Sequence, residues 1–190
     1  MNRLENWFCD SGLWHQVTRR RLLPWILEGA ELGDHLLEIG AGPGAATAEL
    51  RGRAGRVTSL EYDHKFAAKL GACLDRNNGG VLQGDAARLP FRNNTFSAAI
   101  AVLVLHHLRS SELQDHAFAE IFRVLRPGGT FLVFEIENGW FQRALHVRST
   151  FVPLGAAGAF ARLTTAGFAR VVVDFRLGSF RIRAVRAREN

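Results

Sequence analysis

Residues 36–44 read Leu36-Leu37-Glu38-Ile39-Gly40-Ala41-Gly42-Pro43-Gly44, an apolar run that carries one acid and leads into three alternating glycines. This pattern predicts a buried strand followed by a tight turn. Glycine permits positive φ angles and lets a ligand approach the backbone closely. The helix expected after the turn has amide donors without intrahelical partners at its start. We therefore expect the turn to seat a polar cofactor.

A second short strand, Val57 to Glu61, also ends in a carboxylate. Glu61 follows Gly40 by 21 residues, close to the roughly 20 expected when an acid at the second strand end binds a ribose diol. The turn can also be read as the G-x-G-x-x-G/A fingerprint of dinucleotide-binding domains, because Gly40, Gly42 and Ala45 fall at its positions. These two strand ends fit NAD and S-adenosylmethionine alike.

Three later motifs separate the two cofactors. They are Gln83-Gly84-Asp85-Ala86 with Leu89-Pro90-Phe91, an apolar strand that closes in His106-His107-Leu108, and Val124-Leu125-Arg126-Pro127-Gly128-Gly129 before another strand. With these motifs in this order, the chain resembles the class I S-adenosylmethionine-dependent methyltransferases, in particular the small-molecule branch similar to ubiquinone and menaquinone biosynthesis methyltransferases. The resemblance extends from about Leu36 to the end of the chain, and it disfavours an NAD-dependent dehydrogenase.

The resemblance assigns roles to the strand ends. It implies that the turn from Glu38 to Gly44 lies against the methionyl end of the cofactor, that Glu61 binds both ribose hydroxyls and that Asp85 takes the adenine amino group. An unpaired charge on Glu38 would be costly inside an apolar strand. We expect Glu38 to accept hydrogen bonds from the glycine turn or from the cofactor's amino group, with a purely structural partner as the rival. The expected cofactor-binding residues are Glu38, Gly40, Ala41, Gly42, Gly44, Glu61, Tyr62, Asp85, Ala86 and Val102, and the product would be S-adenosylhomocysteine.

Two adjacent histidines are the candidate catalytic residues. Methyl transfer from a sulfonium is a direct displacement, so the protein mainly aligns the reactants and excludes water. A protonated oxygen nucleophile also needs a base, which His can supply near neutral pH. His106 and His107 end the fourth strand; as neighbours they should point in different directions, so at most one faces substrate. Structural or positioning roles are the rival interpretation.

The sequence does not identify the methyl acceptor. We expect a small organic molecule, methylated at oxygen, carbon or nitrogen in that order of preference. A catalytically silent S-adenosylmethionine-binding protein is the alternative from another class, because no residue is an unambiguous base. Aromatic and histidine side chains of the N-terminal segment and of the segment after the fifth strand are the candidate substrate wall, with core packing as the rival: Trp7, Phe8, Trp14, His15, Trp25, Trp140, Phe141, His146 and Phe151.

The order of predicted elements indicates an α/β fold. Strands are expected at residues 35–39, 57–61, 80–83, 97–104 and 129–136, and helices at 44–54, 64–77 and 112–125. Such alternation predicts a parallel sheet covered on both faces. A helical stretch at 142–167 should precede strands at 168–175 and 179–187, which form an antiparallel hairpin at one sheet edge. We expect a Rossmann-like, doubly wound, seven-stranded and mostly parallel sheet, in the order 3-2-1-4-5-7-6 that the resemblance implies.

Length and composition suit one domain. With 190 residues and 47% hydrophobic content, the chain can bury a substantial core. We expect a single methyltransferase domain over 1–190, with an N-terminal helical cap at 1–33 and a Rossmann-like core at 34–190. Ser97 stands where the family often places an acid. The short segment between the fifth and sixth strands leaves the site open, or covered by residues 1–30 or by a dimer partner; we expect a monomer or a homodimer.

The formal charge of +6 raises the question of nucleic acid. Arginine supplies 22 of the 24 basic residues and is spread along the chain. Clusters at Arg19-Arg20-Arg21 and at Arg181, Arg183, Arg186 and Arg188 could steer an anionic substrate or touch a phosphate backbone. They are not interleaved with aromatic residues as in a base-stacking platform. RNA methylation therefore stays an alternative, and we do not expect nucleic acid to be the partner.

The two cysteines, Cys9 and Cys73, form no C-x-x-C pair and no repeated metal spacing, so we expect neither a disulfide framework nor a metal site. The N-terminus lacks the apolar core of a signal peptide. The longest aliphatic run, Ala98 to Leu105, is far shorter than the roughly 20 residues that span a bilayer. These features lead us to expect a soluble cytoplasmic protein.

Overall fold

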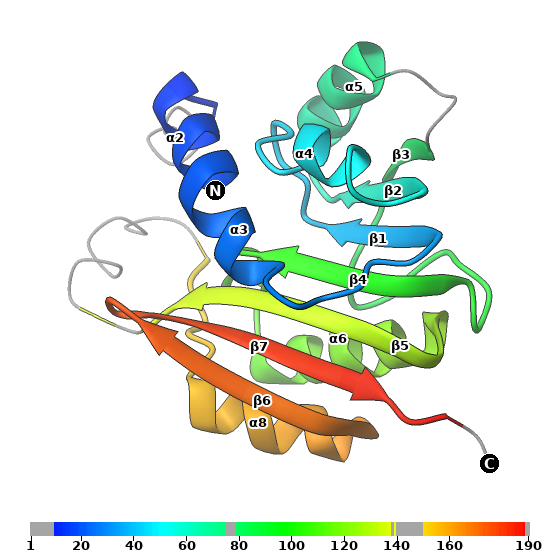
Figure 1. The fold of residues 1–190 in the computed structure, drawn as a ribbon, viewed down its shortest axis with the longest axis vertical. Coiled ribbons are helices and arrows are strands. Elements are labelled where there is room, and N and C mark those ends of the chain that lie inside the picture. Colours follow the sequence, from blue (N-terminus) through cyan, green and yellow to red (C-terminus); the bar gives the residue numbers. More distant parts are fainter. Residues whose placement is uncertain (1–9, 75–78, 138, 140–149, 189–190) are drawn as a thin grey trace.

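The computed structural model describes residues 10–74, 79–137, 139 and 150–188. Its centre is one seven-stranded sheet with helices on both faces (Figure 1). The strand order β3-β2-β1-β4-β5-β7-β6 confirms the expected α/β fold and topology. In chain order the strands are β1 (His35–Ile39), β2 (Arg56–Glu61), β3 (Gly79–Gln83), β4 (Phe96–Val102), β5 (Leu125–Ile136), β6 (Phe168–Arg176) and β7 (Ser179–Arg186).

The first five strands run parallel and the last two are antiparallel. β1 pairs with β2 and with β4, β2 pairs with β3, and β4 pairs with β5, all in parallel. β7 pairs antiparallel with both β5 and β6. The β6–β7 turn consists of Leu177 and Gly178, whose φ angles are 47° and 71°. Positive φ at both positions matches the right-handed twist of the flanking strands, so the predicted antiparallel hairpin is confirmed.

The helices flank this sheet. They are α2 (Gly12–Val17), the π-helical turn η1 (Thr18–Leu22), α3 (Leu23–Ile26), α4 (Thr47–Arg51), α5 (His64–Cys73), the short 3₁₀ turn η3 (Leu105–His107), α6 (Ser111–Val124) and α8 (Ala156–Thr165). Three of them begin at side-chain caps: Ser11 accepts from Trp14 N at the start of α2, Asp63 accepts from Lys65 N at the start of α5, and Ser110 accepts from Leu113 N at the start of α6. Such caps satisfy amide donors that the first helical turn leaves unpaired.

Several element boundaries differ from the sequence prediction, and the fifth strand, β5, begins at Leu125 instead of residue 129. The helix expected at 44–54 begins only at Thr47, because the glycine turn continues beyond Gly44. β4 ends at Val102 because Leu103 has a φ of 53° and cannot continue the strand. Of the helical stretch expected at 142–167, only α8 is helical among the described residues; residues 142–149 lie outside them, and Pro153 falls before the helix.

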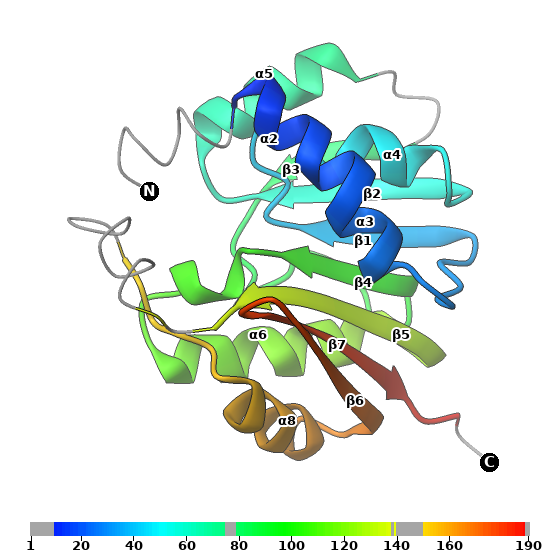
Figure 2. The same cartoon turned by 60° about the vertical axis from the view of Figure 1, so that its left-hand side comes forward.

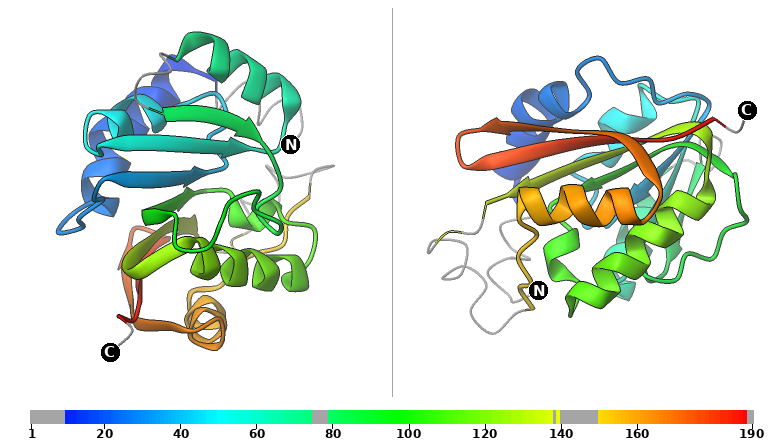
Figure 3. Two further views of the ribbon diagram at one scale, coloured as in Figure 1. Left: turned by 90° about the vertical axis from the view of Figure 1, so that its right-hand side faces the viewer. Right: turned by 90° about the horizontal axis from the view of Figure 1, so that it is seen from below.

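Apolar side chains form one core on each face of the sheet. The first core packs α6 and α8 against alternate strand residues, for example Phe118 and Leu163 against Phe131. The second core packs α3 and α4 against the other face, with Leu23 and Leu50 as buried members. In the right-hand view of Figure 3, α6 and α8 lie on one side of the sheet and the N-terminal helix on the other. Because both faces are covered, the central strands are apolar without polar alternation.

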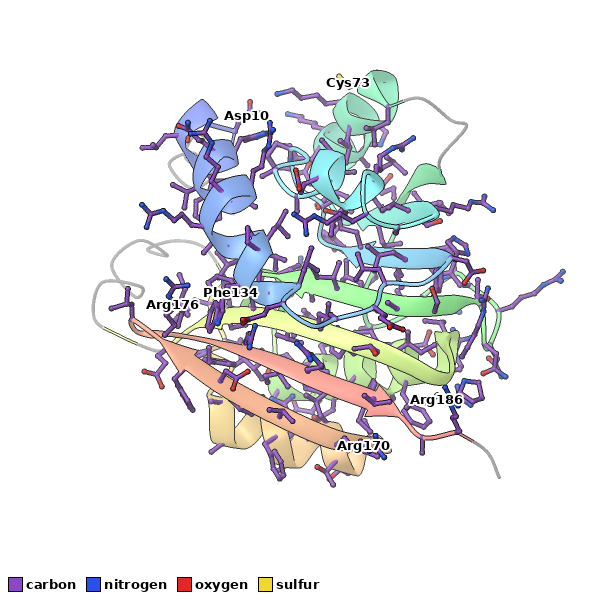
Figure 4. The ribbon with its side chains drawn as sticks, viewed as in Figure 1. Asp10, Cys73, Phe134, Arg170, Arg176 and Arg186 are labelled. Carbon is purple, nitrogen blue, oxygen red and sulfur yellow. The ribbon has the colours of Figure 1, made fainter. Side chains whose placement is uncertain are left out.

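Three of the four arginines clustered near the C-terminus make contacts within the chain. Arg181 donates to Trp25 O and forms an ion pair with Asp174, and Arg183 donates to Glu28 O. Arg186 donates to Phe122 O and Leu125 O at the end of α6 (Figure 4). These arginines hold the N-terminal helices and α6 to the hairpin. Because their guanidinium groups are engaged within the chain, they are less available to bind a phosphate.

Ser97 has a structural function at the amino ends of the strands, at the other end of β1 from the glycine turn. Its hydroxyl lies 2.7 Å from Leu32 O and accepts a hydrogen bond of 2.9 Å from His35 N. These contacts fasten the entry of β1 to the start of β4. The serine found where the family often has an acid therefore lies at the amino ends of the strands.

Other expected features concern membranes, metals and thiols. No described helix combines the length and apolarity that crossing a membrane requires. Within the described ranges, no group of three or more His, Cys, Asp or Glu side chains is arranged to hold a metal ion. Cys73 is an exposed free thiol, and Cys9 lies outside the described residues.

Candidate active site

A pocket of about 470 Å³ opens at the carboxyl ends of the parallel strands. This is the edge where open α/β sheets bind ligands, next to the point where the strand order reverses between β1 and β4. The residues expected to bind the cofactor line it with one exception: Glu38, Gly40, Ala41, Gly42, Glu61, Tyr62, Asp85, Ala86 and Val102 are in the wall and Gly44 is not. His107 is in the wall, whereas His106 is not.

Glu61 joins the end of β2 to the glycine turn. Its Oε2 accepts a hydrogen bond of 2.7 Å from Gly42 N, and its Oε1 accepts one of 2.8 Å from Asp63 N. The residue is 8% exposed. A carboxylate has about four acceptor positions, so each oxygen can accept one more donor from the pocket. Glu61 can therefore shape the turn and bind a pair of ligand hydroxyls at the same time.

Two of the three glycines in the turn are required by packing within the protein. A Cβ on Gly40 would lie 2.2 Å from Val104 Cγ2, and a Cβ on Gly44 would lie 2.6 Å from Leu70 Cδ1. Both residues also have positive φ angles, 70° and 92°. Only Gly42 faces open space, since a Cβ there would meet no neighbouring atom within 4 Å. The close approach to the backbone that the sequence analysis expected of this turn is therefore open at Gly42, while the other two glycines make room for Val104 and Leu70.

Glu38 is held by two hydroxyl groups beneath the pocket. Its Oε2 accepts from Ser59 Oγ at 2.6 Å and from Thr47 Oγ1 at 2.8 Å. Neither donor belongs to the glycine-turn backbone, so the structural partner named above as the rival is present. Burial raises the pKa of Glu38, the hydroxyls of Ser59 and Thr47 oppose this effect, and the charge of Glu61 adds to it.

The raised pKa of Glu38 predicts a dependence of stability on pH. The folded protein holds the Glu38 proton more tightly than the unfolded chain, whose pKa is near the ordinary value of 4.5. The stabilisation is therefore complete below that value and is lost as pH rises through the folded pKa. Glu38→Gln, whose amide oxygen can still accept both hydroxyls, lacks this loss. Urea unfolding of both proteins at a series of pH values should show the wild-type free energy of unfolding falling relative to the variant above pH 4.5. A constant difference between them would contradict the prediction.

The remaining expected cofactor residues lie at the ends of β2, β3 and β4. Tyr62 is 64% exposed at the rim. Asp85 is exposed, and its Oδ1 accepts a hydrogen bond of 2.9 Å from Ala87 N. Together with Glu61, these residues extend the pocket along the sheet edge from β3 toward β4. That arrangement suits an elongated ligand.

The two histidines lie in the 3₁₀ turn η3 and not at the end of the fourth strand, as the sequence analysis had them, but their surroundings differ as expected. His106 Nδ1 lies 2.6 Å from Glu135 Oε2, and both residues are buried. The Oε1 atom of Glu135 accepts a hydrogen bond of 2.9 Å from Leu105 N. His107 Nδ1 lies 3.3 Å from Thr150 O, at the pocket wall. His106 is therefore paired in the core, and His107 is the histidine that borders the pocket.

Sequence reasoning missed the polar side chains that hold the η3 turn. Gln114 of α6 donates to Leu105 O at 3.0 Å and to Val152 O at 2.9 Å. Val152 N donates in turn to His106 O at 2.8 Å. Glu135, Gln114 and the segment from Thr150 thus surround the turn that carries His107. A signal was present, since Glu135 is an acid inside the apolar run of β5, as Glu38 is in β1.

The N-terminal helix supplies the outer wall of the pocket through Trp14 and Thr18. Of the other candidate wall residues, His15 and Phe151 are not in the lining, and Trp25 packs edge-on against Phe134 in the core at 5.9 Å. Trp7, Phe8, Trp140, Phe141 and His146 lie outside the described residues. Core packing, the rival interpretation for the segment after the fifth strand, is found in α8, whose Ala159 and Leu163 are buried.

Comparison with known proteins agrees with this geometry. Residues 37–133 match the family model described as a methyltransferase domain. The chain is 32% identical over 156 residues to the ubiquinone/menaquinone biosynthesis C-methyltransferase of Pseudomonas putida strain GB-1, an alignment that covers 76% of this chain and 59% of that protein. The chain spans about half to three fifths of the length of the curated relatives it matches.

Solved structures show the same fold at low sequence identity. An S-adenosylmethionine-dependent methyltransferase from Mesorhizobium loti superposes with a TM-score of 0.72 and 18% identity, covering 87% of this chain and 96% of that one. A chain in the complex between the Haloferax volcanii Trm112 methyltransferase activator and its methyltransferase gives a TM-score of 0.74 and 18% identity, covering 98% and 99%. By its matching domain model and its curated relatives, the chain belongs to the family of S-adenosylmethionine-dependent methyltransferases.

Proposed function

We propose that this chain binds S-adenosylmethionine in the pocket at the carboxyl ends of β1, β2 and β3 and transfers its methyl group to a small organic acceptor. The observation that carries the proposal is the charge of the pocket wall. Besides the buried Glu38, three acidic side chains line it, Glu61, Asp63 and Asp85, and Arg109 is the one arginine or lysine among the described lining residues. The chain as a whole has a formal charge of +6, so the acidic character of the pocket wall differs from that of the whole protein.

The sign of this charge separates the two nucleotide cofactors. S-adenosylmethionine carries a positive sulfonium and an ammonium group, which carboxylates attract, whereas the pyrophosphate of NAD is an anion, which they repel. The helix after the glycine turn, α4, has only five residues, so it offers a pyrophosphate little of the support that dinucleotide-binding helices give. Both features favour the sulfonium cofactor.

The residues fit such a cofactor from end to end. Glu61 has acceptor positions left for two ribose hydroxyls, Asp85 lies one strand further out for the adenine amino group, and the turn beside Gly42 leaves room for the methionyl part. The volume of about 470 Å³ lies within the roughly 300–1,000 Å³ usual for small-molecule sites. When bound, S-adenosylmethionine supplies an electrophilic methyl group on sulfur.

The acceptor belongs on the β4 side of the pocket. This part of the wall consists of Val102, Leu103, Val104, His107, Leu108, Arg109, Leu113 and Thr150. The acceptor therefore meets mainly apolar surface, one imidazole and one guanidinium. His107 is placed to hold an acceptor group or to take its proton, while His106 orients the turn from the core. Because the relatives at about 32% identity are named as C-methyltransferases, we place carbon ahead of oxygen and nitrogen as the methylated atom.

The proposal is tested by ligand binding and then by transfer. Thermal denaturation with S-adenosylhomocysteine, and separately with NAD, should show stabilisation by S-adenosylhomocysteine alone. Labelled methyl transfer from S-adenosylmethionine into a small-molecule extract, followed by mass spectrometry, should identify a labelled metabolite. Stabilisation by NAD alone would overturn the proposal. Tight S-adenosylhomocysteine binding without transfer to any pool, small molecules or RNA, would instead favour the silent binding protein.

A further inference from the structure

Thr18 is a buried polar residue of the N-terminal helix that the sequence prediction did not single out. It is 1% exposed and lies in the wall of the pocket. A helical threonine commonly donates its hydroxyl to a carbonyl four residues earlier. Here Thr18 Oγ1 has no hydrogen-bond partner among the described residues. A buried hydroxyl without a partner lowers the stability of the free protein, so its presence in a ligand pocket needs a reason.

The backbone at Thr18 is also unusual. The helix changes from α to π geometry over η1, and Leu23 N donates to Thr18 O, five residues earlier. Single π turns inside helices are rare and occur frequently at functional sites. Thr18 lines the pocket together with Trp14, four residues before it. Two successive turns of the helix thus contribute to the wall.

The N-terminal helix crosses the ligand-binding edge of the sheet, and its contacts fix where Thr18 lies along that edge (Figure 2). Asp10, before α2, forms a 2.8 Å ion pair with Lys69 of α5. Arg19 lies 3.5 Å from Glu49 of α4. Trp25 of α3 packs against Phe134 of β5. Figure 4 shows Asp10 and Phe134 at the two ends of this crossing. Thr18, next to Arg19, therefore lies at the level of α4 and of the glycine turn that precedes it.

The position of Thr18 along the sheet indicates which part of the bound cofactor lies beside it. The ends of β3 and β2 carry Asp85 and Glu61, which the proposed function assigns to the adenine and the ribose. The next part of an extended S-adenosylmethionine, beside the glycine turn after β1, is its amino-acid end. We propose that the Thr18 hydroxyl hydrogen-bonds the amino-acid end of the bound cofactor, so that the ligand completes a polar group that the free protein leaves unsatisfied. This inference rests on the proposed function.

The test compares two ligands and two variants. S-adenosylhomocysteine has the amino-acid end, whereas methylthioadenosine has the nucleoside and the sulfur but lacks it. Thr18→Val removes the hydroxyl and keeps the branched shape, and Thr18→Ser keeps the hydroxyl. By calorimetry we expect Thr18→Val to bind S-adenosylhomocysteine about tenfold more weakly than the wild type, a loss typical of one hydrogen bond to a charged group. Its affinity for methylthioadenosine should be unchanged, and Thr18→Ser should bind both ligands within about twofold of the wild type.

Thermal denaturation of the free proteins supplies a second readout. Thr18→Val should melt at the same temperature as the wild type or higher, because it removes an unpaired buried hydroxyl. A merely structural threonine would instead lower the melting temperature and leave the ratio of the two affinities unchanged. Equal S-adenosylhomocysteine binding by Thr18→Val and wild type, or an equal loss for both ligands, would overturn the inference. A wild type that binds neither ligand would overturn the proposed function itself.

Discussion

Replacing Glu135 by alanine is expected to lower the free energy of unfolding by about 3 kcal/mol, because two buried donors lose their acceptor and each costs roughly 1–3 kcal/mol. Glu135 is 1% exposed and accepts from both His106 Nδ1 and Leu105 N. Without it, a ring nitrogen and a backbone N–H stay buried without their acceptor. Chemical denaturation monitored by circular dichroism measures the change through the shift in transition midpoint.

Glu137→Ala is the matched control for Glu135→Ala. Glu137 lies two residues further along the chain and its side chain is exposed, so we expect a change within about 0.5 kcal/mol. Glu135→Gln keeps an acceptor oxygen for one of the two donors and should fall between the alanine variant and the wild type. A Glu135→Ala variant as stable as Glu137→Ala would show that the pair does not hold the η3 turn.

Replacing Glu61 by alanine is expected to weaken S-adenosylhomocysteine binding by roughly 10- to 100-fold, since hydrogen bonds to a charged group contribute about 1.5–3 kcal/mol. Two effects contribute. The ribose loses its acceptors, and the glycine turn loses the 2.7 Å hydrogen bond from Gly42 N that fixes its shape. Calorimetric titration of the purified variant measures the sum.

Controls separate binding from folding in the Glu61 experiment. Glu31→Ala removes an exposed acid before β1, outside the pocket lining, and should leave the affinity unchanged. Glu61→Gln keeps one oxygen acceptor and loses the charge, so its affinity should lie between those of alanine and wild type. If Glu61→Ala binds S-adenosylhomocysteine as tightly as the wild type while remaining folded, Glu61 does not contact the ligand.

Much of the fold could be predicted because its signals are local. The apolar runs of β1, β4 and β5 and the glycines after β1 are contiguous in the chain, so periodicity and turn chemistry locate them. The hairpin was likewise predicted from two neighbouring strands, and the structure joins them by the two-residue turn Leu177-Gly178. The boundaries of the elements were less predictable. The end of β4 depends on the positive φ of Leu103, and a leucine in the sequence gives no indication of a positive φ.

The roles of individual polar residues required distant partners. Glu38 could be recognised as an acid in an apolar strand, but its partners Thr47 and Ser59 come from α4 and β2. The arginines near the C-terminus suggested a binding surface, yet Arg181 and Arg186 are used to hold Trp25 and the end of α6. In each case the residue type was visible in the sequence and the partner was not.

The α/β alternation and the acids at the ends of β2 and β3 could be read from the order of neighbouring residues, and the resemblance of the motifs indicated the family. Packing in three dimensions places Thr18 in the pocket wall, pairs Glu135 with His106, and fits Val104 and Leu70 against Gly40 and Gly44. These contacts join residues brought together only when the sheet and its helices pack. The free energy of a buried contact depends on that packing, and local sequence patterns do not encode it.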